Sequence, residues 1–184
     1  MRTEGWAKAM TRLEALVDRL DANEDKELLA QTHKKIGLCA EALYLDDQAL
    51  DHLELTQKLV PPDLETLSAL GRLNHKKGNY RDAERYLTEV LDKYKRKLEP
   101  DEQVKVLMLL GESALKTKNI AKAQVYLKQV VEAQPNDPKA LDNIIEVLSA
   151  HGEWSEVVRY QERLLSLKTD KQDRYKILLA MGDT

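Results

Sequence analysis

Apolar and small residues recur at helical spacing along most of this chain. In one segment the stripe is formed by Val104, Leu107, Leu110, Gly111 and Ala114. Spacings of three, four and seven residues place such side chains on one face of an α-helix. A second stripe follows after a short break, at Ala123, Leu127 and Val130. The pattern therefore predicts two consecutive amphipathic helices, each with one face to bury.

The same pair of segments occurs several times. The second segment is clearest as GNYRDAERYL (78–87), KNIAKAQVYL (118–127) and GEWSEVVRYQ (152–161), whose starts are 40 and then 34 residues apart. The first segment precedes each of them as LSALGRL (67–73), LMLLGES (107–113) and LDNIIEV (141–147). It also occurs as HKKIGLC (33–39) and as LLAMGD (178–183). Internal repetition at this period predicts a stack of helical hairpins, since one hairpin alone cannot bury both of its apolar stripes.

These repeated residues resemble the tetratricopeptide-repeat family, whose unit of about 34 residues forms two antiparallel helices. With units starting at Ala30, Leu64, Val104, Pro138 and Tyr175, the family's glycine at unit position 8 is matched by Gly37, Gly71, Gly111 and Gly182, and Ile145 departs from it. Its alanine at position 20 is matched by Ala49, Ala83 and Ala123, with Val157 departing. The aromatic or large apolar residue at position 17 is Tyr80, Ile120 or Trp154, and the proline at position 32 is Pro61 or Pro135.

The resemblance implies an all-α fold, a right-handed superhelical solenoid of antiparallel helix hairpins with a concave face. We expect a single solenoid over 1–184. It would consist of a leading helix (1–22), repeat units 30–63, 64–103, 104–137 and 138–174, and the first helix of a further unit (175–184). The first unit matches least well, because Thr56 and Gln57 stand where apolar residues are expected.

Glycines and prolines lie where this arrangement needs them. Gly78 and Gly152 fall at position 15, where the first helix ends and a left-handed residue is required. Position 8 is where the two helices of a unit approach each other closely. The prolines all lie at joins between units, which suits a residue that cannot continue a helix but can start one: Pro61, Pro62, Pro100, Pro135 and Pro138.

The two ends and one join depart from the regular unit. The leading helix resembles a second helix without its first, with Trp6 and Ala9 at positions 17 and 20. The last segment resembles a first helix without its second, which would leave Ile177, Leu178 and Met181 uncovered. We therefore expect that the chain is a fragment of a longer protein, or that this end packs on another copy. The unit at 64–103 has six extra residues, which we expect to lengthen its second helix through DKYKRKLEP (92–100) and to loosen the turn that follows.

Composition narrows the class of function. The net charge of -3 gives no bulk attraction to nucleic acid or to an anionic membrane, and no apolar run is long enough to span a bilayer. Cys39 is the single cysteine, which excludes an intrachain disulfide and suits a reducing compartment such as the cytoplasm. The basic cluster Lys93, Lys95, Arg96 and Lys97 is expected at a helix C-terminus, where cations complement the helix dipole.

No motif in the sequence predicts catalysis, a cofactor or a metal. His33, His52, His75 and His151 fall on different helices or turns without metal-ligand spacing, and His33 is interpreted as a packing residue. Cys39 is expected to be a buried, inert thiol. Acidic pairs such as Asp46 with Asp47, and Asp18 with Asp21, are interpreted as solvated faces or helix caps, and Asp46 is expected to begin a helix. The glycines are spread singly, so there is no phosphate-binding loop and no GxSxG motif. An enzyme is therefore not predicted.

The resemblance does predict where a partner would bind. In this family the first helix of each unit lines the concave groove, chiefly through positions 2, 5, 9, 12 and 13. Carried onto this sequence, the partner-binding candidates are Lys34, Glu41, Ser68, Arg72, His75, Lys76, Lys105, Met108, Glu112, Lys116, Asp142 and Glu146, with Leu38, Glu65, Leu115, Lys139 and Ser149 beside them. The groove would be basic near Arg72 and Lys76 and acidic near Asp142 and Glu146. A chaperone-tail clamp is not expected, because Leu38 and Arg72 stand where its asparagines would be.

Three functions remain open at this point. The first is a non-catalytic scaffold that binds a peptide or protein in its concave groove. The second is a self-assembly module that forms homo-oligomers through its open ends or its groove. The third is a regulatory segment of a larger enzyme or of a secretion or assembly machine. Nucleic acid and membrane insertion are not expected.

Overall fold

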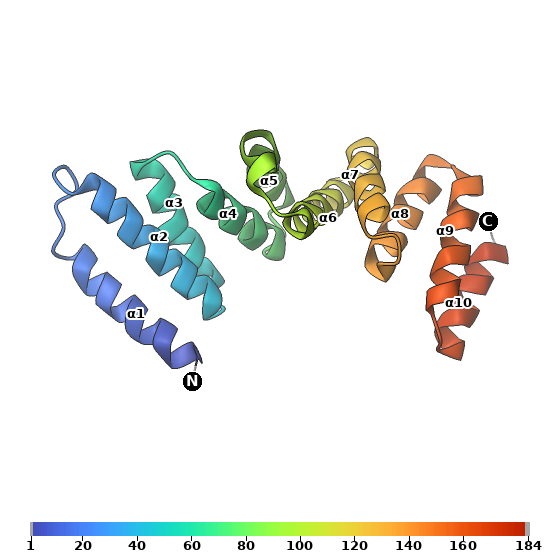
Figure 1. Ribbon diagram of the computed structural model, residues 1–184, viewed down its shortest axis with the longest axis horizontal. Helices are drawn as coiled ribbons and strands as arrows, with labels where there is room; N and C mark the ends of the chain where they lie inside the picture. Colours follow the sequence, from blue (N-terminus) through green and yellow to red (C-terminus); the bar gives the residue numbers. More distant parts are fainter. Residues whose placement is uncertain (1, 183–184) are drawn as a thin grey trace. The chain divides into compact units, whose positions relative to one another are not determined.

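The computed structural model describes the backbone of residues 2–182 and the side chains of residues 4–182 (Figure 1). Within these residues the chain forms α-helices, one 3₁₀ turn and no strand. The α-helices are α1 (Arg2–Val17), α2 (Lys26–Ala42), α3 (Asp46–Leu59), α4 (Leu64–Lys76), α5 (Tyr80–Tyr94), α6 (Pro100–Lys116), α7 (Ile120–Ala133), α8 (Pro138–His151), α9 (Trp154–Leu167) and α10 (Lys171–Gly182). The predicted all-α fold is confirmed.

The helices belong to two compact units, Met1–Tyr94 and Lys95–Thr184, which are described separately. In the first unit α2 pairs with α3 and α4 pairs with α5, while α1 packs on α2 and α3 packs on α4. In the second unit α6 pairs with α7 and α8 pairs with α9, while α7 contacts α8 and α10 packs on α9. Each unit is therefore built from helical hairpins that stack on their neighbours in chain order (Figure 1).

A glycine–leucine contact holds the two helices of a hairpin close together. A Cβ atom built on Gly37 would lie 2.7 Å from Leu53, and one on Gly71 would lie 2.5 Å from Leu87. The equivalent distance from Gly111 to Leu127 is 2.6 Å. Real Cβ atoms do not approach other atoms so closely, so these positions admit only glycine without rearrangement. The predicted role of position 8 is confirmed in these three hairpins.

The end of each first helix needs a left-handed residue, as predicted. Gly78 and Gly152 have φ of 81° and 73°. Tyr44 and Lys118 stand at the same unit position in the other hairpins, and their φ values are 61° and 59°. A residue with a Cβ is unfavourable in this conformation, so the repeat geometry holds Tyr44 and Lys118 in a turn that glycine would fill without strain.

The insertion between the two units differs from the prediction. Helix α5 ends at Tyr94 and is one residue longer than α7, with 15 residues against 14. The chain then makes a 3₁₀ turn at Lys95–Lys97 and buries Leu98. A capping box between Glu99 and Glu102 starts α6 at Pro100, ahead of the expected Val104. The extra residues therefore form a turn and an early helix start, because Pro100 cannot extend α5 but can begin α6.

Polar residues replace apolar ones in the core of two hairpins. Thr56 is 2% exposed, and its hydroxyl donates to the backbone oxygen of His52 at 2.9 Å. Gln57 donates to the hydroxyl of Tyr86 at 2.9 Å. Gln161 in α9 is 5% exposed, and its Oε1 atom has no hydrogen-bond partner among the described residues. Hydrogen bonding thus explains the polar residues of the first hairpin, whereas Gln161 leaves a buried acceptor unsatisfied.

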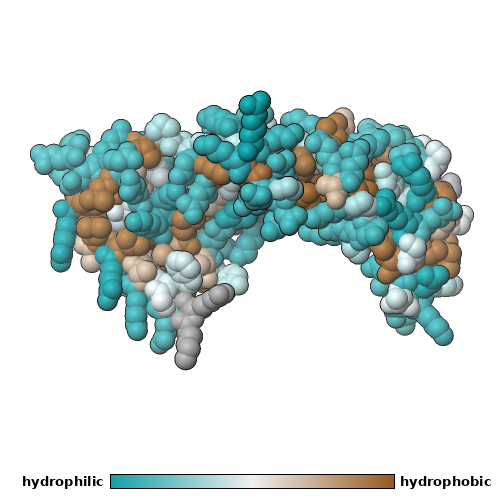
Figure 2. All heavy atoms as spheres, viewed as in Figure 1, coloured by the Kyte–Doolittle hydropathy of each residue, from teal (hydrophilic) through white to brown (hydrophobic). Residues whose placement is uncertain are grey.

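Helix α10 has no buried residue. Tyr175, Leu178 and Leu179 are 63%, 50% and 53% exposed. Leu178 is uncovered as predicted, whereas Ile177 and Met181 are partly covered. Where Figure 1 draws α9 and α10, the space-filling view shows apolar residues reaching an otherwise mostly hydrophilic surface (Figure 2). None of the helices in the described part of the chain is long and apolar enough to cross a membrane.

Candidate functional site

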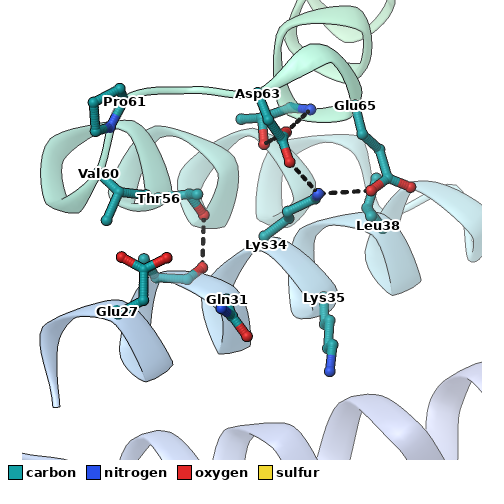
Figure 3. A pocket seen from close by; sticks show the side chains of 12 residues that line it. Glu27, Gln31, Lys34, Lys35, Leu38, Thr56, Val60, Pro61, Asp63 and Glu65 are labelled. Carbon is teal, nitrogen blue, oxygen red and sulfur yellow. Dashed lines mark hydrogen bonds and ion pairs between the residues drawn. The ribbon is translucent and has the colours of Figure 1, made fainter.

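A hollow of about 500 Å³ lies where α2, the end of α3 and the start of α4 meet (Figure 3). We call it the α2–α4 hollow, and it is lined by Glu27, Ala30, Gln31, Lys34, Lys35, Leu38, Thr56, Val60, Pro61, Asp63, Glu65 and Thr66. The Val60–Pro61 segment is extended because it links two hairpins, and it leaves one wall of the hollow apolar. The hollow therefore combines an apolar wall with a charged rim inside the first unit.

Lys34 occupies the centre of the charged rim. Its Nζ atom lies 2.6 Å from Asp63 and 2.7 Å from Glu65, so it bridges α2 to the first turn of α4 (Figure 3). Asp63 also caps α4 by accepting a hydrogen bond from the backbone nitrogen of Thr66 at 2.9 Å. Burial lowers the pKa of Lys34, but the bonds to Asp63 and Glu65 outweigh it and raise that pKa overall. Lys34 is therefore a firmly charged residue that already has two carboxylate partners.

Two further ion pairs join the first and second hairpins along the same side. Arg72 makes a bidentate contact with Glu41, at 3.1 Å and 3.0 Å. Lys76 lies 2.5 Å from Asp46 and 5.4 Å from the centre of the Tyr44 ring. We refer to these contacts, with those of Lys34, as the inter-repeat ion pairs. Each cation lies beside a carboxylate, which offsets its positive charge. The expectation of a basic surface near Arg72 and Lys76 is therefore corrected to one of paired, opposite charges.

The second unit links its hairpins in a similar way. Lys139 of α8 lies 2.7 Å from Glu112 of α6. Asn143 donates to the same Glu112 at 3.4 Å and to the sulfur of Met108 at 3.6 Å. Met108 and Glu112 were both predicted as groove residues, and the structure places them at this junction of α6 and α8.

The remaining candidates lie on the predicted first helices without forming one cluster. Ser68 and His75 are half-buried on α4, and the ring of His75 meets that of Tyr80 edge-on at 5.6 Å. Lys105 and Lys116 are exposed on α6. Asp142 and Glu146 are exposed one turn apart on α8. Partial burial and Asp173 raise the pKa of Asp142, and they outweigh the opposite effect of Lys168.

Sequence reasoning missed part of the hollow. Val60, Pro61 and Glu27 line it without occupying a groove position of the repeat, whereas Gln31 stands at groove position 2 but was not among the predicted candidates. Pro61 had been recognised only as a break between units. The signal that could have found these residues is the join itself, because an extended link between two helices exposes its side chains beside the next helix start.

His33 and His52 form a pair that the sequence spacing concealed. Their Nδ1 atoms are 2.9 Å apart, between α2 and α3, and His33 is 8% exposed. His33 is a packing residue, as interpreted, but it packs on a second histidine. One ring must donate and the other accept, so the contact requires at least one neutral imidazole. Among the described residues there is no group of three or more side chains that could hold a metal ion.

We expect the His33–His52 pair to make the first unit less stable in acid. Burial, and then His52, lower the pKa of His33; burial also lowers that of His52 despite the opposing charges of Glu14 and Asp51. The unfolded chain therefore takes up protons at higher pH than the folded chain, so stability falls as the pH drops below about 6.5. Urea unfolding of the natural chain and of His52→Asn, at roughly pH 7.5 and 5.5, measures this.

In that comparison the natural chain should lose more stability on acidification than His52→Asn. The difference between the two proteins isolates the histidine pair from the many surface carboxylates. An equal loss in both proteins would contradict the expectation.

Cys39 is buried in α2, and burial raises the pKa of its thiol. The predicted buried state is thus confirmed. Its thiolate fraction is small, because a raised pKa disfavours the charged form.

Comparisons with known proteins agree with this geometry. A tetratricopeptide-repeat family model matches residues 62–136. Among solved structures, MamA AMB-1 superposes with a TM-score of 0.73 at 17% identity, covering 89% of each chain. PilF of Pseudomonas aeruginosa gives 0.63 at 14% identity, covering 97% of this chain and 85% of its own. YrrB, described as a TPR protein with an unusual peptide-binding site, gives 0.67 at 17% identity, covering 80% and 73%. A search of curated protein sequences gave no significant match.

These results confirm the predicted resemblance. The match at 62–136 begins at the end of the first hairpin and runs through α4, α5, α6 and α7. The structural similarities extend the same fold to most of the chain.

Proposed function

We propose that this chain of tetratricopeptide repeats is a non-catalytic scaffold that binds a peptide segment of a partner protein, and that the α2–α4 hollow is the primary contact. The observation that carries the proposal is the hollow itself, with its apolar wall beside a rim of charged side chains. A concave site with a few oriented polar groups is the usual form of a ligand-binding surface.

The shape of the hollow indicates what a bound segment would offer. Leu38 and Val60 both line the hollow and are half-buried, so apolar groups of the partner would displace water from them. Lys35 and Glu27 are exposed on the rim and would contact polar groups of the bound segment. We propose that Asp142 and Glu146 of the second unit contribute a separate acidic surface that favours basic residues of the partner.

We also propose that the protein is located in the cytoplasm. Cys39 is a lone, buried thiol, and its use suits a reducing compartment such as the cytoplasm.

Selection of short random peptides displayed on phage tests the scaffold function. Peptides enriched on the natural chain should carry an apolar residue, and Leu38→Glu should weaken their binding about tenfold or more, as for a central interface residue. Leu55→Glu is the matched control, because Leu55 is a 39% exposed leucine of α3 that does not line the hollow. The scaffold proposal fails if no peptide is enriched, or if enriched peptides bind Leu38→Glu as tightly as Leu55→Glu.

A further inference from the structure

Three hairpins of this chain, α2–α3, α4–α5 and α6–α7, close by one shared contact. In α4, Leu67 and Leu70 flank the approach of Gly71 to Leu87 of α5, and both are 0% exposed. In α5 the matching face consists of Ala83, Leu87 and Val90, all 0% exposed. The same glycine–leucine contact recurs between α2 and α3 and between α6 and α7. A first helix with this face is therefore covered, in each of these three cases, by a second helix with the other face.

Helix α10 carries the first of these two faces without a cover. Leu178, Met181 and Gly182 stand at the unit positions that Leu67, Leu70 and Gly71 hold in α4. Leu178 is 50% exposed, where Leu67 is fully buried. A Cβ atom on Gly182 would meet no atom of residues 2–182 within 4 Å, where one on Gly71 would meet Leu87. The groove that a leucine fills in three hairpins is open in α10.

Helix α1 carries the second face. Ala9, Leu13 and Leu16 have the spacing of Ala83, Leu87 and Val90 in α5. Helix α1 packs on α2, yet these three side chains are only half-buried. Trp6, at the position of Tyr80, is 44% exposed. Helix α1 thus packs on α2, and the side that carries Ala9, Leu13 and Leu16 is only partly covered, unlike the fully buried matching face of α5.

We propose that α10 of one copy packs antiparallel on α1 of a second copy, in the register of α4 on α5. Leu13 of the second copy then lies against Gly182, and Leu16 of the second copy lies against Leu178. The interface completes a repeat unit from two chains and uses neither the hollow nor the inter-repeat ion pairs. It therefore goes beyond the scaffold function.

Charge favours the same pairing. In an antiparallel arrangement the start of α10 lies beside the end of α1 and the loop that follows it. The start of α10 presents Lys171 and Lys176, both exposed, and the end of α1 presents Asp18 and Asp21, both exposed. Opposite charges at this end would stabilise the antiparallel register over a parallel one. Because the two faces differ, the contact is heterologous, and a dimer keeps one free face of each kind.

Sedimentation velocity with two blocked variants tests the proposal. Leu178→Glu blocks the α10 face and Ala9→Glu blocks the α1 face, so each variant alone should stay monomeric. Mixed in equal amounts they should form a one-to-one dimer and nothing larger. The Leu178→Glu chain offers only its α1 face and the Ala9→Glu chain only its α10 face, so the dimer uses both open faces. The natural chain should grow in mass with concentration up to about 200 µM, where contacts of micromolar strength are populated. Val125→Glu, at a 59% exposed residue of α7, should associate like the natural chain.

Gly182→Ala provides a second variant that does not disturb the monomer. Among the residues that the structure describes, the new methyl group meets no atom within 4 Å, so thermal unfolding of the dilute protein should be unchanged or slightly improved. In the assembled form it would meet Leu13 of the second copy, and association should weaken at least tenfold. The proposal is overturned if the natural chain stays monomeric, if either blocked variant associates alone, if the mixture forms no dimer, or if Gly182→Ala associates normally.

Discussion

Replacing Gly71 with alanine should lower the free energy of unfolding by about 1–3 kcal/mol, the usual cost of overpacking a core. The added methyl group would lie 2.5 Å from the nearest carbon of Leu87, which is itself fully buried. Leu87 cannot move aside without displacing its own neighbours, because interiors are close-packed. Urea unfolding followed by circular dichroism gives the change directly.

A second substitution identifies the cause. Leu87→Ala alone should cost about 2–5 kcal/mol, because it leaves a cavity. In that background Gly71→Ala should cost nothing, and it could gain up to about 1 kcal/mol from the better helix propensity of alanine. Gly5→Ala is the matched control, because a Cβ atom at Gly5 meets nothing within 4 Å in the described part of the chain. If Gly71→Ala costs the same with and without Leu87, the contact does not explain the glycine.

Gln161→Met should raise the free energy of unfolding by about 1–2 kcal/mol, since leaving a buried acceptor unpaired costs about that much. Gln161 is 5% exposed and its Oε1 atom is unsatisfied. Methionine has nearly the same shape and no polar group to desolvate, so the packing can be kept.

The repeat register explains why methionine is chosen over leucine. Gln161 stands at the position of Leu53, Leu87 and Leu127, but its counterpart at position 8 is Ile145 rather than glycine. A leucine branched at Cγ needs the space that the missing glycine side chain leaves in the other hairpins. Gln161→Leu should therefore gain less than Gln161→Met. Thermal unfolding of the two variants beside the natural chain decides this, and equal or greater stability of the leucine variant would contradict it.

The features that recur were predictable from the sequence alone. Helices, turns and the close approach at Gly37, Gly71 and Gly111 follow from spacing, since each repeat presents the same pattern to its neighbour. The left-handed turns at Gly78 and Gly152 follow in the same way. Tyr44 and Lys118 adopt the same left-handed conformation although they are not glycines. Only their position in the repeat register could have indicated that conformation.

The features that occur once were harder to predict. The His33–His52 contact joins residues 19 apart on two helices, so no local motif contains it. The Lys95–Lys97 turn depends on which residues of the insertion can stay helical. Pro100 begins α6 and cannot continue α5, so α5 is not lengthened through the insertion. The hollow depends on the path of the Val60–Pro61 link, which the repeat pattern does not define. The positions predicted to face a groove were found on the expected helices, but their ion pairs depend on side-chain geometry between repeats.

The inter-repeat ion pairs have a consequence for how fast a partner would arrive and how salt would affect it. Lys34, Arg72 and Lys76 already have carboxylates within about 3 Å, so their fields are largely cancelled a few ångströms into the solvent. Long-range attraction speeds association only when one sign of charge dominates a surface. Partner capture by the first unit should therefore proceed at an unassisted rate of about 10⁵–10⁶ M⁻¹s⁻¹, with little dependence on ionic strength.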